Sequence, residues 1–288
     1  MHMFEDKVRQ TIDQLQHGSF QAMSAAIAAK RMAWLDRNLP ARTPPFTPRE
    51  AYELLFFEQM DLERDELPVV SETENEIVWL SGNRCSLLEA CIALGLDTRQ
   101  VCRPVNEKAT QAFFSRLDPQ LRFHRSYTEI RPYAEYCREK IIRIDFDAYM
   151  RVAIQEAQLS KSEGNKGYGA IVVFEDRIVG QAHDTAITEG DPSLHAEVNA
   201  IRQAVKTLGD PDLCGAILFS TCEPCPTCAS LAVWANVTTI VYGMSVAETT
   251  RLGRTRINVS AKQIIDRSPV AIEVIGDILH DECKTLYG

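Results

Sequence analysis

The 288-residue chain has no apolar run that approaches the ~20 residues of a membrane-spanning helix. Its first ten residues are charged and lack the apolar stretch of a secretory signal peptide. Basic residues are also scarce, since 31 Lys and Arg stand against 40 Asp and Glu, for a net charge of −9. These absences argue against a membrane protein and against strong binding to a phosphate backbone. A chain with a negative net charge can still carry a local basic patch.

The nine cysteines form no pattern typical of a disulfide framework. Their number is odd, and three of them lie between residues 222 and 228. Four others lie in the first half of the chain, with spacings that match no close-paired set of metal ligands: Cys85, Cys91, Cys102 and Cys137. For these four we favour buried free thiols over a second metal or an iron–sulfur cluster. The overall pattern indicates a reducing, cytoplasmic compartment.

Two short motifs carry the chemistry: a His-x-Glu motif beginning at His195, and a Cys-x-x-Cys motif joining Cys225 to Cys228. One histidine and two cysteines supply three protein ligands, the number in a catalytic zinc site that keeps its fourth position for water. Glu197 would lie beside that water without binding the metal. A structural zinc site normally has four ligands, and a redox Cys-x-x-Cys pair needs no His-x-Glu, so the motifs favour a catalytic Zn2+ ion.

Each motif is expected at the beginning of a helix. Ser193 is a candidate N-cap for a helix that would hold His195 and Glu197 in its first turn and end at Gly209. Pro226 suits the first position of a second helix, which would carry the cysteine motif. Two helix N-termini would then converge on one point, where their positive ends favour thiolate over thiol.

Around these motifs the chain resembles the cytidine deaminase-like superfamily, and within it the branch of guanine deaminases and tRNA adenosine deaminases. The matching stretches are residues 191–201 and 220–228, and the resemblance extends from about Asp145 to the C-terminus. It implies an α/β/α sandwich around a five-stranded mixed sheet, and a homodimer. It also implies a zinc-dependent hydrolysis that replaces an amino group of a nucleobase or related heterocycle with oxygen and releases ammonia, with Glu197 transferring the protons.

The substrate is suggested by one departure from the superfamily pattern. Eleven residues before the zinc histidine the superfamily usually carries an asparagine that hydrogen-bonds the base, whereas this chain has Asp184. An ionised aspartate only accepts hydrogen bonds, so a ring edge rich in N–H donors is expected, as in guanine-like bases, aminopterins or amino-triazines. A slip of one position would place His183 there instead and leave Asp184 facing solvent. Ala196 and Glu223 are the other substrate-binding candidates.

Two alternatives to a free-base deaminase stay open. The first is a tRNA adenosine deaminase, but residues 145–288 hold twelve Lys and Arg against nineteen Asp and Glu, which is a poor composition for RNA binding. The only basic cluster of this half contains Arg251, Arg254 and Arg256, which we interpret as a solvated loop in preference to a phosphate site. The second alternative is a non-catalytic zinc scaffold, which would have no use for Glu197.

The domain organisation follows from the extent of the resemblance. Residues 1–144 are expected to form a smaller α+β module with a proline-rich linker at 38–48, and the remaining chain forms the deaminase domain. Within the first module the pattern predicts one helix over 5–37 and another over 132–141. A closing helix is predicted over 277–287. Three roles stay open for the first module: covering the active site, dimerisation, or binding a regulatory small molecule.

Overall fold

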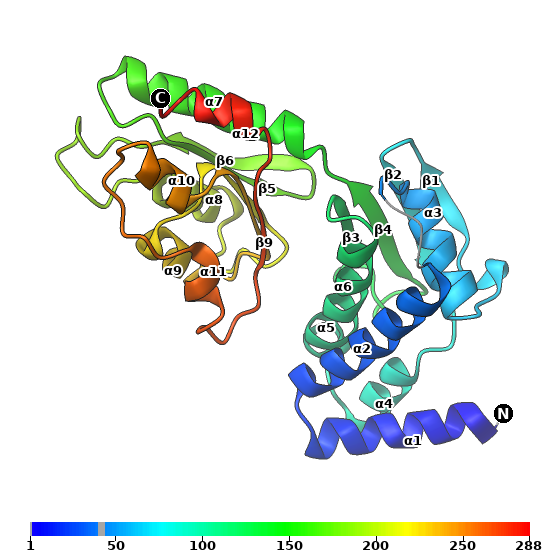
Figure 1. Cartoon of the computed structure of the whole chain (residues 1–288). Coiled ribbons are helices and arrows are strands. Elements are labelled where there is room, and N and C mark those ends of the chain that lie inside the picture. The colour runs from blue at the N-terminus through cyan, green and yellow to red at the C-terminus, as the bar shows by residue number, and fades with distance from the viewer. Residues whose placement is uncertain (1, 40–43) are drawn as a thin grey trace. The chain divides into compact units, whose positions relative to one another are not determined.

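The computed structural model describes residues 2–39 and 44–288, so the part of the proline-rich linker that includes Pro40 lies outside the described residues. The chain divides into two compact units, and the boundary along the chain lies between Ile144 and Asp145 (Figure 1). None of the described helices is both long and apolar enough to cross a membrane.

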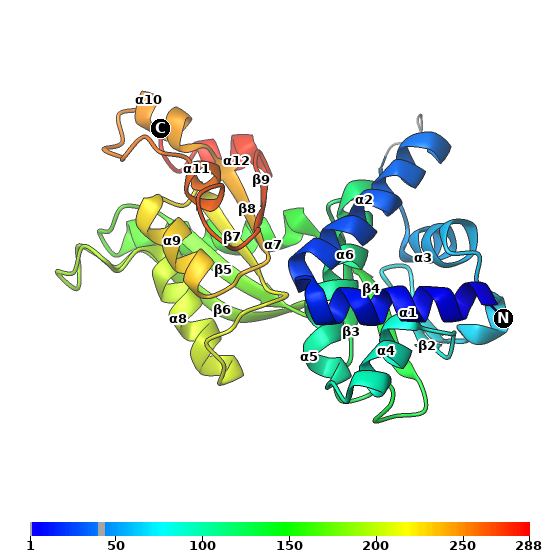
Figure 2. The same cartoon turned by 90° about the horizontal axis from the view of Figure 1, so that it is seen from below.

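The first unit is built on a four-stranded antiparallel sheet with the strand order β1-β2-β4-β3. Its elements in chain order are α1 (His2–His17), α2 (Phe20–Asn38), α3 (Pro48–Glu53), the π-helical turn η1 (Leu54–Gln59), the 3-10 turn η2 (Arg64–Glu66), β1 (Val69–Glu72), β2 (Glu76–Ser81), α4 (Ser86–Leu94), α5 (Thr98–Cys102), the π-helical turn η3 (Arg103–Glu107), α6 (Lys108–Leu117), β3 (Leu121–Arg125) and β4 (Cys137–Arg143). The main core of this unit centres on aromatic rings, among them Tyr52, Trp79, Phe113 and Phe114. Helix α1 runs beside α4 (Figure 2).

The prediction of one helix over 5–37 is wrong, because the chain breaks between α1 and α2. Gly18 separates the two helices, and Ser19 adopts an extended conformation and accepts a hydrogen bond from the amide of Ala22 through its hydroxyl. Glycine is a poor helix former and serine is a favoured N-cap, so this pair ends one helix and begins the next.

The prediction of a helix over 132–141 is also wrong, because β4 occupies the end of that range. β4 is hydrogen-bonded on both edges, to β2 and to β3. Its consecutive residues Ile141 and Ile142 are both buried, as expected for a central strand that is covered on both faces. Both partner strands, β2 and β3, lie outside 132–141, so no pattern within that range could reveal the pairing.

The second unit contains the five-stranded mixed sheet that the resemblance implied, which confirms the predicted α/β/α sandwich. Its elements are α7 (Phe146–Ser162), β5 (Gly169–Phe174), β6 (Arg177–His183), α8 (Ala196–Leu208), β7 (Ile217–Cys222), α9 (Pro226–Trp234), β8 (Thr239–Met244), α10 (Val246–Arg251), α11 (Ala261–Ile265), β9 (Glu273–Ile275) and α12 (His280–Lys284). The strand order is β6-β5-β7-β8-β9, with the β7-β8 and β8-β9 pairs parallel and the others antiparallel. Figure 1 shows α7 and α12 against one face of this sheet and α8 and α9 against the other.

Two glycines let helices approach this sheet closely. A Cβ on Gly169 would lie 2.0 Å from the carbonyl oxygen of Ala153 in α7, and a Cβ on Gly180 would lie 2.1 Å from the carbonyl oxygen of Ala200 in α8. No real side chain tolerates such distances, so both positions require glycine. The close contact between β6 and α8 fixes the helix that carries the His-x-Glu motif.

The closing helix is shorter than predicted. Asp277 and Leu279 both have positive φ angles, of 65° and 48°, and α12 therefore begins only at His280. A non-glycine residue in the left-handed region cannot belong to a right-handed helix, which explains the late start.

Candidate active site

The two motifs lie at the N-termini of α8 and α9. His195 is the N-cap of α8, and Cys225 is the N-cap of α9, followed by Pro226 at the first helical position. The prediction of Ser193 as N-cap is wrong, because its amide and hydroxyl both donate to the carboxylate of Asp191 in the preceding loop, at 2.8 and 2.7 Å. The C-terminal stop of α8 at Gly209, in the left-handed conformation, is confirmed.

The three candidate metal ligands form a compact triangle. His195 Nδ1 lies 3.6 Å from Cys225 Sγ and 3.4 Å from Cys228 Sγ, and the two sulfurs are 3.5 Å apart. A tetrahedral zinc ion with Zn–S of about 2.3 Å and Zn–N of about 2.0 Å requires S–S and N–S separations of about 3.8 and 3.5 Å. The side chains therefore fit a zinc ion in type, number and spacing, and leave one tetrahedral position for water.

The environment favours the thiolate form of Cys225, whereas the hydrogen bond with Cys225 and burial raise the pKa of Cys228. The pKa of Cys225 is lowered to about 3, first by the hydrogen bond from Cys228 and then, against the effect of burial, by His195. Hydrogen bonding with Cys225 also raises the pKa of His195, opposed by burial, with smaller contributions from the charges of Glu197 and Asp184. Sulfur at a helix N-terminus beside a histidine is a typical setting for a reactive or metal-bound thiolate.

Among the described residues, two groups of at least three His, Cys, Asp or Glu side chains place their ligand atoms within 4.8 Å of one another. One is the His195 triangle, and the other is the partly exposed group of Glu248, Asp277 and His280. Neither contains any of the four cysteines of the first unit, which are free thiols. Cys91 and Cys102 are buried, whereas Cys85 and Cys137 are half-buried.

Glu197 is the second residue of α8, and its side chain is buried, with the residue only 5% exposed. Its Oε1 accepts a hydrogen bond from the hydroxyl of Ser220 in β7, at 3.1 Å. Burial raises the pKa of Glu197, as does the nearby Cys225, whereas Arg256 opposes the shift. A buried carboxyl group with a raised pKa beside a metal site has the properties of a general acid–base.

Asp184 follows β6 directly and is 1% exposed, so it does not face solvent. Its backbone is fixed from two sides: Ser160 Oγ donates to its carbonyl oxygen at 2.9 Å, and Asn199 Nδ2 donates to the neighbouring carbonyl of His183 at 3.0 Å. One carboxylate oxygen has a long contact of 3.4 Å with the amide of Ala186. The buried carboxylate therefore makes little use of its hydrogen-bonding capacity within the chain.

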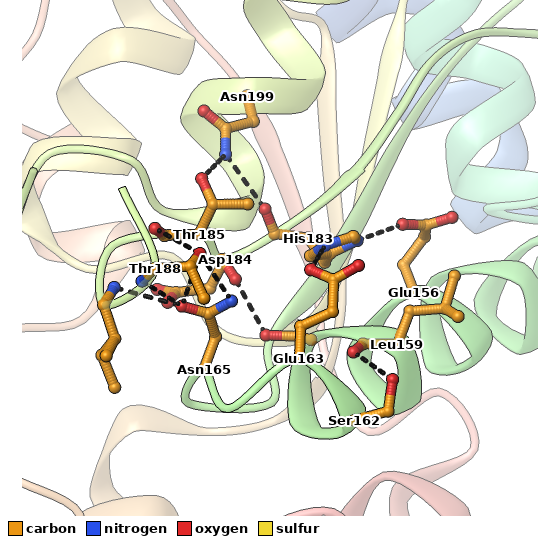
Figure 3. Close-up of polar contacts among 12 residues, drawn as sticks. Glu156, Leu159, Ser162, Glu163, Asn165, His183, Asp184, Thr185, Thr188 and Asn199 are labelled. Atoms are coloured by element: carbon orange, nitrogen blue, oxygen red, sulfur yellow. Dashed lines mark hydrogen bonds and ion pairs between the residues drawn. The ribbon is translucent and has the colours of Figure 1, made fainter. Parts of the chain in front are cut away.

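His183, the alternative to Asp184, is engaged elsewhere. Its Nδ1 lies 2.7 Å from Glu156 and its Nε2 lies 2.9 Å from Glu163, both on the α7 side of the sheet (Figure 3). Figure 3 shows His183 directed towards these glutamates, and Asn165 beside Asp184 holding the following loop through Thr188. Of the two adjacent residues, Asp184 is the one whose charge acts on His195.

Glu223 and Ala196 lie next to the two metal-binding motifs in the chain. Both carboxylate oxygens of Glu223 accept backbone amides, those of Val246 at 2.9 Å and Ala261 at 2.8 Å, which begin helices α10 and α11. Ala196 is fully buried at the first position of α8, where its amide has no intrahelical acceptor. The geometry therefore gives Glu223 a clear structural task and offers the Ala196 amide, not its side chain, for a ligand contact.

Sequence reasoning missed two residues near Glu197, Ser220 and Arg256. Arg256 lies over the ring of Tyr168 with 5.0 Å to the centroid, and its Nη2 donates to the carbonyl of Glu223 at 2.8 Å. Arg254 likewise donates to the carbonyls of Lys166 and Leu286, both at 3.3 Å. The interpretation of this cluster as a solvated loop is therefore wrong for Arg254 and Arg256. The polar residues around them in the sequence gave no local signal that the two side chains would be engaged in this way.

Comparison with known proteins shows which family the chain is similar to. Residues 143–244 match the family model of the cytidine and deoxycytidylate deaminase zinc-binding region. A tRNA-specific adenosine deaminase of Bacillus subtilis is 34% identical over 137 residues, which cover 48% of this chain and 83% of that protein. The chain belongs to this family of zinc deaminases. A guanine deaminase of the same organism is 32% identical over 111 residues, 38% of this chain and 71% of that protein.

A further relative is a probable cytosine deaminase of Schizosaccharomyces pombe, 28% identical over 140 residues, 47% of this chain and 85% of that protein. Membership makes this deaminase a zinc-dependent hydrolase of C–N bonds in nucleobases or nucleosides, as predicted, and sets aside the scaffold alternative. The relatives differ in substrate, so the family alone does not identify the ring that is deaminated.

Proposed function

We propose that this deaminase acts on a free, guanine-type heterocycle, with His195, Cys225 and Cys228 as the zinc ligands. Zinc in such a site supplies a water that loses its proton near neutral pH. Glu197 accepts a proton from the hydrolytic water and delivers it to the ring nitrogen next to the reacting carbon. It then takes the proton of the hydroxyl group that has added to the reacting carbon and passes it to the departing amine, which leaves as ammonia while the carbonyl group forms.

Ser220 and the Ala196 amide complete this arrangement. The hydroxyl of Ser220 holds one oxygen of Glu197 at 3.1 Å and so restricts the rotation of the carboxylate. Burial of Glu197 raises its pKa and thereby favours a group that can both accept and donate a proton. The Ala196 amide, at the positive end of α8, is available to a ring oxygen or nitrogen of the substrate.

The observation that carries the substrate proposal is the buried carboxylate of Asp184. An ionised carboxylate accepts hydrogen bonds and donates none, and among the described residues this one has a single, long contact with a backbone amide. Guanine offers an adjacent ring N–H and amino group, which together can donate two hydrogen bonds to one carboxylate. Adenine presents a ring acceptor beside its amino group and would leave a carboxylate oxygen facing a lone pair, at a cost of about 1–3 kcal/mol.

Ammonia release by the zinc-loaded protein tests the proposal. The panel contains guanine, adenine, cytosine, their nucleosides, an aminopterin, an amino-triazine and a tRNA transcript. We expect turnover of guanine or a related free heterocycle. Glu197→Gln should lower kcat by about 10²–10⁴ with zinc content unchanged, because it removes the proton carrier and no ligand.

Asp184→Asn is the second variant, with Asp266→Asn, an exposed carboxylate of the same unit, as its control. We expect kcat/KM for guanine to fall at least tenfold in Asp184→Asn, because a charge-assisted acceptor is lost, and to stay unchanged in the control. Turnover of tRNA alone would overturn the free-base proposal, and full activity of Glu197→Gln would overturn the assignment of the proton carrier. The homodimer implied by the family resemblance is a separate proposal, tested by light scattering.

A further inference from the structure

The first unit contains a partly open cavity of about 280 Å³ that no feature of the deaminase reaction uses. It lies among α1, α2, α4, α6 and the strands of the four-stranded sheet, and one part of its wall is apolar, with Met23, Ile27 and Phe56. The remaining wall is strongly charged. Its ionisable Lys, Arg and Glu side chains are five cations and one carboxylate: Lys7, Arg31, Arg84, Arg125, Arg131 and Glu139.

The single carboxylate is fully engaged. Glu139 is 3% exposed and forms an ion pair with Arg125 through Oε1. Its Oε2 accepts hydrogen bonds from Trp79 Nε1 at 2.9 Å and from Ser81 Oγ at 2.6 Å. Two guanidinium N–H groups of Arg125 and two neutral donors thus occupy this carboxylate, and its ion pair is with Arg125.

Arg31 is left without a counter-charge. It projects from α2 and is 8% exposed, so more than nine-tenths of it is buried. Within the part of the chain that the structure describes, its hydrogen-bond acceptors are the hydroxyl of Thr110 at 2.8 Å and the thioether of Met60 at 3.9 Å, and no carboxylate forms an ion pair with it. Burial, together with the charge of Arg125, lowers the pKa of Arg31 to about 10, although Glu139 opposes the shift.

Two further polar atoms at this cavity are buried without partners. They are the hydroxyl of Thr98 and the Nε of Arg131, both in residues that line it. Buried polar groups are nearly always hydrogen-bonded, and an unpaired buried cation is more costly still. Arg31 is a buried cation of this cavity that no carboxylate pairs with among the described residues, and an acceptor that carries negative charge would pair with it.

We propose that this cavity is a binding site for a small organic anion, whose carboxylate or phosphate group pairs with Arg31 and whose apolar part lies against Met23, Ile27 and Phe56. Arginine is the side chain best suited to such a pair, because its planar fork matches both groups. The cavity volume is near the lower limit of small-molecule sites, so the ligand is smaller than a typical cofactor. The inference does not depend on the substrate of the deaminase.

Calorimetric titration of the full-length, zinc-loaded protein tests the proposal with matched pairs of probes. Benzoate is compared with benzamide, and phenyl phosphate with phenol, at concentrations up to about 10 mM so that even a Kd near 1 mM is measurable. We expect saturable binding of at least one anion, at least tenfold tighter than that of its neutral partner. The carboxylate and phosphate pairs distinguish the two sources of charge.

Arg31→Met separates this cavity from the zinc site, which can also attract anions. We expect it to weaken anion binding at least tenfold and to leave the thermal midpoint of the unliganded protein equal or higher, because an unpaired buried charge is removed. Arg116→Met, which changes an exposed arginine of the same unit, is the control and should bind like the wild type. A purely structural Arg31 would show the opposite pattern, a lower midpoint with unchanged binding.

Three results would overturn the proposal: equal binding of anions and neutral partners, unchanged binding by Arg31→Met, or no saturable binding of any probe by the folded wild type. The first and third need no variant, so a folding defect of Arg31→Met would not prevent the decision. Arg31→Lys gives a further check, since it keeps the charge and should retain weakened binding.

Discussion

Glu223→Gln distinguishes a structural role of this residue from a role in substrate binding. In the structure each carboxylate oxygen accepts one backbone amide, from Val246 and from Ala261, and the residue is 4% exposed. Glutamine has the same shape, so the substitution creates no cavity. It turns one oxygen into an NH2 group, which then faces an amide N–H.

The magnitude follows from those two bonds. A hydrogen bond to a charged group contributes about 1.5–3 kcal/mol, and a buried donor left unpaired costs about 1–3 kcal/mol. Because the two quantities overlap, we expect the free energy of unfolding of this unit to fall by about 2–4 kcal/mol. For a domain of this size that corresponds to a decrease of about 6–12 °C in the unfolding midpoint.

Scanning calorimetry of the full chain measures the effect on the transition that moves when zinc is chelated. Glu189→Gln, which changes an exposed carboxylate of the same unit, is the control and should lie within about 0.5 kcal/mol of the wild type. At a low temperature, where the variant is folded, KM should stay within about threefold of the wild-type value. An unchanged midpoint together with a large rise in KM would refute this reasoning and make Glu223 a substrate-binding residue.

Two other predictions concern the packing around the site. Burial lowers the pKa of His183, but hydrogen bonds with Glu156 and Glu163 outweigh it and the pKa is raised, so ionised His183 stabilises the fold. This contribution is fully present below the unfolded-state pKa of about 6.5 and is lost as pH rises through the folded-state pKa. The free energy of urea unfolding should therefore differ more between wild type and His183→Gln near pH 6 than near pH 8, and a constant difference would contradict the prediction. Gly180→Ala would place a Cβ 2.1 Å from the carbonyl oxygen of Ala200, so we expect it to destabilise the second unit by about 3 kcal/mol or more in the same assay, and a loss below about 1 kcal/mol would contradict the close approach.

The sequence predicted the second unit well because its signals are local. Strands such as β7 and β8 are short apolar runs, α8 has the period of an amphipathic helix, and Gly209 and Pro226 mark a helix end and a helix beginning. The sequence also predicted that the three candidate metal ligands lie together, because residues with fixed spacing fall on two adjacent helix N-termini. Local periodicity and capping chemistry are what sequence reasoning handles best.

The errors arose where distant partners decide the structure. β4 forms because strands on both sides pair with it, and Glu223 acts on amides that lie 23 and 38 positions later in the chain. Arg31 meets Thr110 across 79 positions. None of these contacts produces a periodic pattern near the residue concerned, so the strand pairing of the first unit and the supporting interactions of the site could not be predicted from the sequence.

The local placement of arginines says more about RNA binding than the net charge of the chain. A net charge of −9 did not prevent a cavity with five cations from forming in the first unit, so an acidic average alone excludes little. In the second unit, Arg254 and Arg256 are two of the three members of the basic cluster. They donate hydrogen bonds to backbone carbonyls and lie over the rings of Tyr287 and Tyr168, respectively. Arginines held in this way are poorly placed to follow a phosphate backbone, which depends on exposed cations that can release counterions. The local arrangement therefore supports a free heterocycle over tRNA more strongly than the net charge does.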